Sequence, residues 1–244
     1  MLKRFFLGIA AVIWILAILN PLSYDHAQVS AASPLVANGR FRVVVAATLA
    51  TTVDVWVDGA ATAEVAVKPL NSSGFITVTA TANHIVSLFQ TGTTTAVGPT
   101  YTINLTSAND TSLIFLSGNT WMSLLDSGVA PNPSEATARV INLSPDNLSV
   151  SLVVDATTPS PFTFPAVDYK SASPAYAAFS VGPHTLSIPA DSTIPSITYN
   201  FKNGHVYSIF LFRDTNLAKT KILVAAEKSF STGPTKLFFP IVFH

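Results

Sequence analysis

Apolar residues recur at every second position through most of residues 38–230, and short groups of Gly, Pro, Asn, Asp and Ser interrupt them. No window of a dozen residues in this stretch keeps the 3.6-residue spacing of an amphipathic helix. In residues 53–59 three valines share one face, while Asp54, Trp56 and Asp58 share the other. We expect the valine face to be buried and Asp58-Gly59 to form a turn. The pattern therefore predicts a protein built from β-strands.

The predicted strands divide into two groups, each of seven short strands in about 100 residues, which is typical of a β-sandwich. The first group is 41–47, 53–57, 62–67, 75–80, 85–90, 101–105 and 112–116. The second group is 139–143, 149–154, 176–180, 185–188, 197–201, 206–212 and 221–226. Prolines 159, 161, 165 and 174 lack the amide that a central strand needs, so we expect loops or an edge strand there.

The two groups are similar in sequence. Residues 42–58 align with 139–155 without a gap, and five of the seventeen pairs are identical, Arg42 with Arg139 and Asp58 with Asp155 among them. The apolar alternation stays in phase across the alignment, and 83–88 then matches 183–188. The sequence therefore predicts an internal duplication, with one domain at 38–130, a proline-containing linker at 131–136 and a second domain at 137–230.

The amino terminus has the order of an export signal. Lys3 and Arg4 precede an apolar run at 5–19, and Asn20-Pro21 ends the run. Fifteen residues of helix cover about 22 Å, which is short for a bilayer core of about 30 Å. We predict a signal peptide at 1–31 with cleavage after Ala31, and an uncleaved membrane anchor is the alternative.

Composition narrows the classes of function. Of 244 residues, 49% are hydrophobic and 11% charged, and 13 basic residues balance 13 acidic ones, which gives no electrostatic basis for binding nucleic acid or an anionic membrane. We expect membrane association only if the amino-terminal segment is uncleaved. The absence of Cys excludes disulfides, thiol nucleophiles, Cys-ligated zinc and a lipoprotein anchor.

A family resemblance joins these observations. Residues 53–59 (VDVWVDG) and 138–147 (ARVINLSPDN) resemble the opening strands of the domain-of-unknown-function 4397 family, whose pattern is roughly R-V-x-H-x-S-P-D-A-P-x-V-D-V-Y-V-D-G. Each copy keeps half of the pattern, with Asn142 where the family has His and Ser151 where it has Asp. The resemblance implies tandem immunoglobulin-like or transthyretin-like antiparallel sandwiches exported to bacterial envelopes, for which no enzymatic activity is established.

Catalytic and metal chemistry find little support in the sequence. No Gly-x-Ser-x-Gly segment is present, and His84 and His184 lie at equivalent repeat positions, which favours a shared structural role over catalysis. Asp54 and Asp58 are about 13 Å apart along a strand, too far for a glycosidase pair. We interpret Asp58 as a turn residue, together with Asp155, and the Ser-Pro-Asp-Asn segment at 144–147 as a turn rather than an ion site. No catalytic residue, metal ligand or cofactor is predicted.

Asp54 and Trp56 are the predicted surface contact, because an indole on an outer strand face can stack on a sugar or a partner protein. Burial of Trp56 against a second sheet or domain is the competing interpretation. The apolar tail at 231–244 is expected either to pack as a last strand or to act as a recognition or sorting signal.

These observations favour an exported, non-enzymatic, secreted or cell-surface module with a binding, adhesion or structural role. Its expected partner is an envelope protein or a glycan whose identity the sequence leaves open. The alternative is an exported carbohydrate-active or hydrolytic enzyme, which would require titratable side chains gathered in one cleft.

Overall fold

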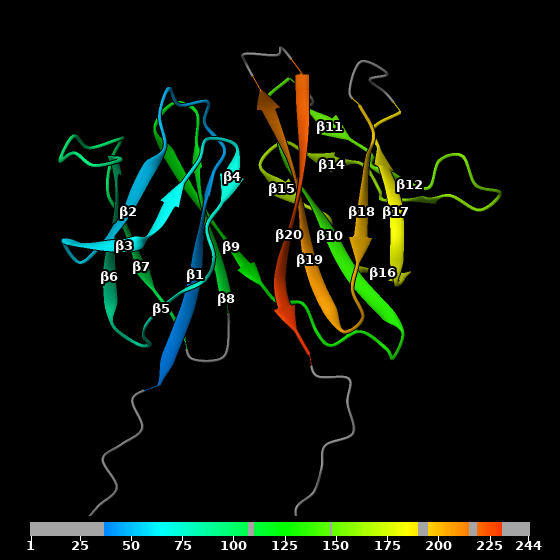
Figure 1. Cartoon of the computed structure of the whole chain (residues 1–244), viewed down its shortest axis with the longest axis horizontal. Coiled ribbons are helices and arrows are strands. Elements are labelled where there is room, and N and C mark those ends of the chain that lie inside the picture. Colours follow the sequence, from blue (N-terminus) through cyan, green and yellow to red (C-terminus); the bar gives the residue numbers. More distant parts are fainter. Residues whose placement is uncertain (1–36, 107–109, 147, 190–194, 215–218, 231–244) are drawn as a thin grey trace, which may run out of the picture. The chain divides into compact units, whose positions relative to one another are not determined.

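The computed structural model describes residues 37–106, 110–146, 148–189, 195–214 and 219–230, and these contain strands, turns and loops but no helix (Figure 1). The predicted all-β fold is therefore confirmed. Within these ranges there is accordingly no helix that could cross a membrane. The predicted cleavage site at Ala31 and the apolar tail at 231–244 lie outside the described residues.

The first half, residues 38–126, consists of two sheets. One sheet, here called the first seam sheet, has β1 and β8 at its centre and β9 at one edge, and its strands are β1 (Asn38–Val45), β4 (Asn71–Ser72), β5 (Ile76–Thr79), β8 (Asp110–Leu116) and β9 (Thr120–Asp126). The other, the first distal sheet, is antiparallel in the order β3 (Ala60–Val67), β2 (Val53–Val57), β6 (Asn83–Gln90) and β7 (Tyr101–Asn104).

The second half, residues 135–229, repeats this strand order. Its seam sheet contains β10 (Glu135–Leu143), β15 (Ser171–Ala172), β16 (Ala177–Ser180), β19 (His205–Asp214) and β20 (Lys219–Ser229). Its distal sheet has the order β13 (Phe162–Thr163), β12 (Val153–Val154), β17 (Gly182–Ser187) and β18 (Ile197–Phe201), and β11 (Ser149–Val150) pairs separately with β14 (Val167–Asp168). The connection at 127–134 carries no strand.

The structure corrects the predicted strands in several places, and the short strands β4, β14 and β15 were not predicted. The predicted strand at 149–154 is broken at Ser151-Leu152 into β11 and β12, which join different sheets. Strand β9 was not predicted, because its apolar residues stand in adjacent pairs (Trp121-Met122 and Leu124-Leu125) and do not alternate. The antiparallel prediction holds for most neighbours, but β1 runs parallel to β8, and β10 runs parallel to β19.

Two local predictions are confirmed. The valine face of β2 is buried, with Val53 and Val55 fully covered, and Asp58 and Gly59 both have positive φ, at 53° and 76°, as a tight hairpin turn requires. The proline-rich stretch after Asp155 forms loops and the edge strand β13.

Each half has a core between its seam sheet and its distal sheet, and a third core joins the two halves. In β1 the residues Phe41, Val43 and Val45 face the first core, and the intervening Val44 belongs to the third core. The third core lies between the two seam sheets and contains Val44, Ala46, Leu70, Ile114, Leu116, Ile141, Leu143, Phe210 and Phe212. Both faces of β1 are thus buried from Phe41 onward, which explains the three consecutive valines at 43–45.

Candidate functional site

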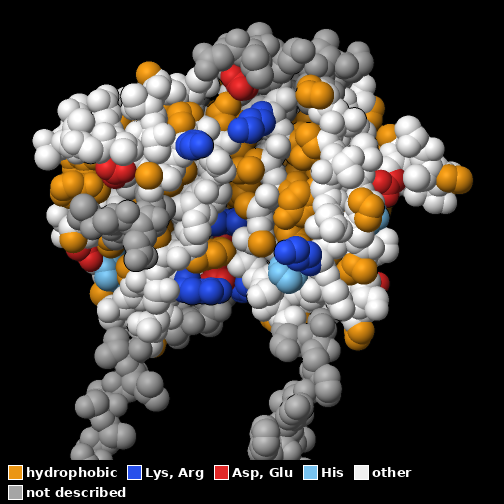
Figure 2. All heavy atoms as spheres, in the orientation of Figure 1, with side chains coloured by type: hydrophobic (Ala, Val, Ile, Leu, Met, Phe, Trp, Pro, Cys, Tyr) orange, Lys and Arg blue, Asp and Glu red, His pale blue; other side chains and the backbone are white. Residues whose placement is uncertain are grey.

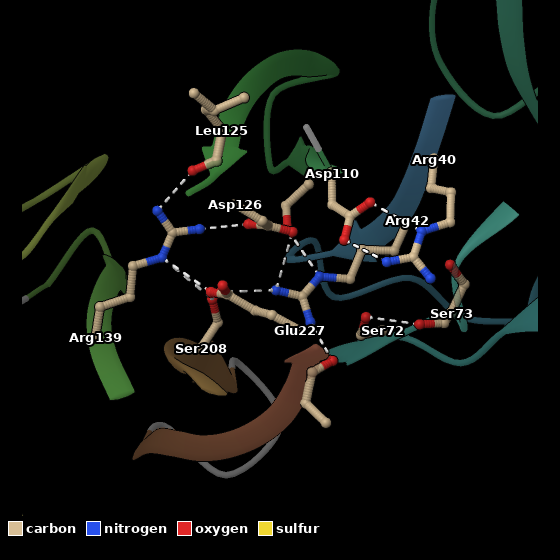
Figure 3. A network of polar contacts seen from close by, with 12 residues as sticks. Arg40, Arg42, Ser72, Ser73, Asp110, Leu125, Asp126, Arg139, Ser208 and Glu227 are labelled. Carbon is tan, nitrogen blue, oxygen red and sulfur yellow. Dashed lines mark hydrogen bonds and ion pairs between the residues drawn. The ribbon is translucent and has the colours of Figure 1, made fainter. Parts of the chain in front are cut away.

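Four charged side chains are buried together at the seam between the halves (Figure 3). Arg42 on β1 and Arg139 on β10 meet Asp126 at the end of β9 and Glu227 on β20, and none is more than 5% exposed. The set carries two positive and two negative charges when all four groups are ionised. Because isolated buried charges are costly, this balance is the first requirement for burying them. We call these four residues the seam cluster.

Within each half, a serine links the arginine to the acid. The Arg42 Nε donates to Ser112 Oγ at 2.7 Å, and Ser112 Oγ donates to Asp126 Oδ2 at 2.9 Å. The Arg139 Nε lies 3.3 Å from Ser208 Oγ, and Ser208 donates to Glu227. The parallel ladders create both links, since Arg42 lies opposite Ser112 and Arg139 lies opposite Ser208 in register.

Across the seam, each arginine binds the other half. Arg42 Nη1 donates to the carbonyl oxygen of Ala226 at 3.2 Å, and Arg139 Nη1 donates to that of Leu125 at 2.8 Å. Arg139 Nη2 also pairs with Asp126, while Arg42 Nη2 lies 4.0 Å from Glu227 Oε1. The cluster therefore ties β1 to β20 and β10 to β9.

Aromatic rings cover both guanidinium groups, but the rings of the two halves differ. Arg42 lies 5.3 Å from the centre of the Phe75 ring and 5.2 Å from that of Phe210, and Arg139 lies 5.1 Å from that of Tyr176. The Tyr176 hydroxyl donates to Glu227 Oε2 at 2.8 Å, a contact that Phe75 cannot make. Among the described residues, Arg42 Nη2 has no hydrogen-bond partner, and its nearest charge is Asp126 Oδ2 at 3.5 Å. The second half of the cluster is thus the better satisfied.

Burial dominates the electrostatics of the cluster. Loss of water and the nearby Glu227 raise the pKa of Asp126 to about 6, although Arg42 and Arg139 oppose this. Burial likewise lowers the pKa of Arg42 and raises that of Tyr176. All four charges face one another inside the seam, so the chemistry that the arrangement supports is the specific joining of the two halves.

A second polar arrangement occurs once in each half. His84 Nδ1 lies 2.7 Å from Asp58 Oδ2, and His184 Nδ1 lies 2.6 Å from Asp155 Oδ2. The second carboxylate oxygen accepts a 2.8 Å hydrogen bond from the amide of Ile85 in one case and of Thr185 in the other. Asp58 and Asp155 do occupy turns, as predicted, but their side chains bind the facing strand and its histidine as well. We call each Asp-His pair a clasp.

Both nitrogens of each clasp imidazole have an oxygen partner. Nδ1 faces the carboxylate, and the Nε2 atoms lie 2.7 Å from the Thr79 carbonyl oxygen and 2.8 Å from the Ser180 carbonyl oxygen. The hydrogen bond to Asp58 raises the pKa of His84, and the same bond lowers the pKa of Asp58. This geometry supports the predicted structural role of the histidines.

One clasp has the order of a catalytic relay. Ser180 Oγ lies 3.3 Å from His184 Nε2, and His184 Nδ1 faces Asp155. A general base needs an Nε2 lone pair to accept the serine proton, and this nitrogen also lies 2.8 Å from the Ser180 carbonyl oxygen, which can only accept a hydrogen bond. The serine hydroxyl and this carbonyl therefore compete for the same ring nitrogen.

The predicted contact residues Asp54 and Trp56 lie together on the outer face of the first distal sheet. Asp54 Oδ2 accepts a hydrogen bond from the Gly92 amide at 2.9 Å, and the Trp56 ring packs 4.6 Å from that of Phe89. Both residues are half-buried and line an open hollow with Gly92, Thr93, Thr94 and Thr95. Neighbouring Phe89 thus covers part of the indole.

The described residues hold no group of three or more His, Asp and Glu side chains placed to bind a metal ion. Asp146, in the Ser-Pro-Asp-Asn segment, pairs with Arg213 of β19. No protein-family model matches the chain, and a search of curated proteins finds no match.

Sequence reasoning missed the seam cluster. The available signal was an arginine between apolar residues at the same position of both repeats, Arg42 and Arg139. An arginine in such a run, if buried, needs an acidic partner. The partners Asp126 and Glu227 lie far along the chain, on strands whose pairing follows from the parallel ladders. Their identity could not be read from local spacing.

Proposed function

We propose that this chain is an exported, non-enzymatic module of two immunoglobulin-like or transthyretin-like β-sandwich domains. Its role is binding, adhesion or structure, as a secreted or cell-surface protein. The proposal depends on the contacts that the charged groups make. The seam cluster joins the two halves, and both clasps hold neighbouring strands together. The domain-of-unknown-function 4397 resemblance supports the same architecture and compartment.

The open hollow beside Trp56 is the proposed contact. Carbohydrate sites combine an aromatic face with a few placed polar groups, and here an indole lies beside a carboxylate and three consecutive threonines. The second half has Ser151 and Val153 at the aligned positions, so this combination belongs to the first half alone. We therefore propose a glycan or an envelope protein as the partner.

The binding test compares Trp56→Ala with Phe162→Ala, both assayed against an array of envelope glycans and in pull-downs from envelope extracts. Phe162 is a matched control, because it is a 40% exposed aromatic residue of the other distal sheet. We expect the wild type and F162A to retain binding and W56A to lose it. Equal binding by all three would remove Trp56 from the proposal, and no binding by any would reject the glycan and envelope partners assayed.

Compartment is tested by the intact mass and amino-terminal sequence of the protein recovered from the medium and from cell fractions. A first residue of Ala32 or Ser33 supports the exported module, whereas Met1 in the membrane fraction supports a tethered one. Recovery only from the cytoplasm with Met1 retained contradicts export.

The alternative function, an exported hydrolase, draws its support from the Ser180-His184-Asp155 series. A fluorophosphonate probe distinguishes the two, because it labels only serines that a neighbouring base activates. We expect no labelling of Ser180 in the folded protein. Labelling that Ser180→Ala abolishes would favour the hydrolase.

A further inference from the structure

The contacts across the seam are reciprocal. Arg42 of the first half binds the carbonyl of Ala226, which directly precedes Glu227, and Arg139 of the second half binds the carbonyl of Leu125, which directly precedes Asp126. Equivalent atoms thus reach equivalent positions in opposite directions. This is the pattern of an isologous interface, in which residue i of one copy contacts j of the other and j contacts i.

The third core obeys the same relation. From β1, the residue that follows it and β8, the first half contributes Val44, Ala46, Ile114 and Leu116. The corresponding positions of β10 and β19 are Ile141, Leu143, Phe210 and Phe212. Equivalent strands of the two halves therefore supply equivalent rows of side chains. The seam has the construction of an interface between two copies of one domain.

The two faces differ in the size of these side chains. At every one of the four positions the first half has the smaller residue, with Ile114 and Leu116 corresponding to Phe210 and Phe212. The first half adds Leu70 and Leu124 to the same core, where the second half adds Ala172 and Ala225. Large residues of one half thus accompany small residues of the other, and pairing like halves would place large against large and small against small. The polar contacts run in both directions across the seam, and the apolar contacts favour unlike halves.

We propose that the seam is a dimer interface fused into one chain, and that the partner of each seam face is the seam face of the unlike half. A second copy of this chain presents that same face, so two chains can exchange halves through it. The connection at 127–134 is the only covalent link between the halves that the described residues show. It is the non-covalent seam that holds the halves together.

The test starts from the folded, full-length protein with a protease site inserted between Pro131 and Asn132. This position is chosen because Gly128, nearer to β9, packs closely against Val206 and Tyr176 and must not be disturbed. After cleavage, native mass spectrometry and size-exclusion chromatography at micromolar concentration identify the complexes. We expect one complex of first half with second half. Separation into free halves would overturn the proposal.

Mixing cleaved wild-type protein with isotope-labelled cleaved protein tests the choice of partner. We expect labelled first halves with unlabelled second halves and the reverse, and pairs of like halves to be rare. Abundant pairs of like halves would overturn the size argument, and an absence of mixed complexes after prolonged incubation would overturn exchange between chains.

A matched pair of variants shows whether the cluster determines pairing. Asp126→Asn removes the acid that Arg139 reaches across the seam, and Asp110→Asn removes an acid that binds Arg40 within the first half. In the cleaved protein, D126N is expected to raise the dissociation constant of the halves about 30-fold or more, and D110N to leave it unchanged. Equal values for both variants would overturn the assignment.

Discussion

The two halves are stabilised by the same kinds of contact, and they differ in the residues at the seam between them. Both carry a clasp after β2 or β12, a serine directly after β4 or β15 that accepts a hydrogen bond from the central strand, and an arginine at the equivalent position of that strand. At the seam, however, Tyr176 and Glu227 of the second half correspond to Phe75 and Asp126 of the first. The repeated residues secure each half, and the unequal residues make the interface directional.

This comparison predicts unequal losses for the two arginines, the largest effects expected. Arg139→Met leaves Asp126 and Glu227 without their closest cation, so the free energy of unfolding should fall by about 3–5 kcal/mol. Arg42→Met should cost less, because one of its nitrogens already lacks a hydrogen bond.

Chemical denaturation of both variants measures the difference, and Arg40→Met is the control, since the Arg40 side chain is 46% exposed and pairs within one half. Equal losses for R139M and R42M would contradict the ranking. A stability of R40M close to that of R139M would show that the position, and not burial, sets the cost.

The larger side chain of one seam face and the smaller side chain of the other can be exchanged by mutation. Phe210→Ile should leave a cavity and cost about 2 kcal/mol, and Ile114→Phe should overfill the same core and cost a similar amount. Carrying both changes restores the total volume, so the double variant should be more stable than the sum of the single losses predicts. Thermal melts of the four proteins complete the cycle, and strictly additive losses would show that the two side chains do not share one core.

The dependence of stability on pH distinguishes the contribution of the seam cluster from that of the clasps. The pKa of Asp126 is raised in the folded state, to about 6, so the folded protein binds this proton more tightly and stability rises as pH falls from 7 towards 4. His84, with a raised pKa, adds stability that is fully present below about pH 6.5 and is lost as pH rises through its folded pKa. Asp58 and Asp155, with lowered pKa values, add stability that is lost when pH falls through their folded pKa values.

These signs together place the maximum of stability between about pH 4 and 6. Melting temperatures measured from pH 3 to 9 test this. In Asp126→Asn, the melting temperature should depend less on pH between about pH 4 and 6. Its dependence on pH below and above this range should remain as in the wild type. A wild-type maximum at pH 8 would refute the directions given for Asp126 and His84.

The sequence predicted the local structure better than the meeting of distant strands. The β2 hairpin follows from three alternating valines and an Asp-Gly turn, all within seven residues, and the structure has it as expected. The parallel pairing of β1 with β8 joins residues that are 70 positions apart, and no turn between them signals it. The seam cluster depends on that pairing. The sequence therefore reveals its two arginines by their equivalent repeat positions, but it does not reveal which acids they bind.

The predicted contact residues show a second limit of what the sequence can predict. Trp56 and Asp54 were predicted on an outer strand face, and they do share one hollow on the first distal sheet. The sequence could not place Phe89 beside Trp56, because Phe89 lies on β6, which pairs with β2 although three other strands separate the two along the chain. Strand alternation reveals which face a side chain takes, but not which side chain stands next to it.

The smallest predicted effects concern the aligned rings that cover the two guanidinium groups. Tyr176→Phe removes the hydroxyl that donates to buried Glu227, and it should cost about 1 kcal/mol. Phe75→Tyr adds a hydroxyl at the aligned position, but the acid aligned with Glu227 is Asp126, one methylene shorter, so the gain should be smaller than the loss in Y176F. Adding Asp126→Glu to F75Y lengthens that acid and should recover part of the difference.

Equilibrium unfolding of Y176F, F75Y and F75Y/D126E measures the three changes in the free energy of unfolding. A gain from F75Y alone that equals the loss in Y176F would mean that the length of the acid does not matter, and the directional character of the seam would then rest on its apolar residues only.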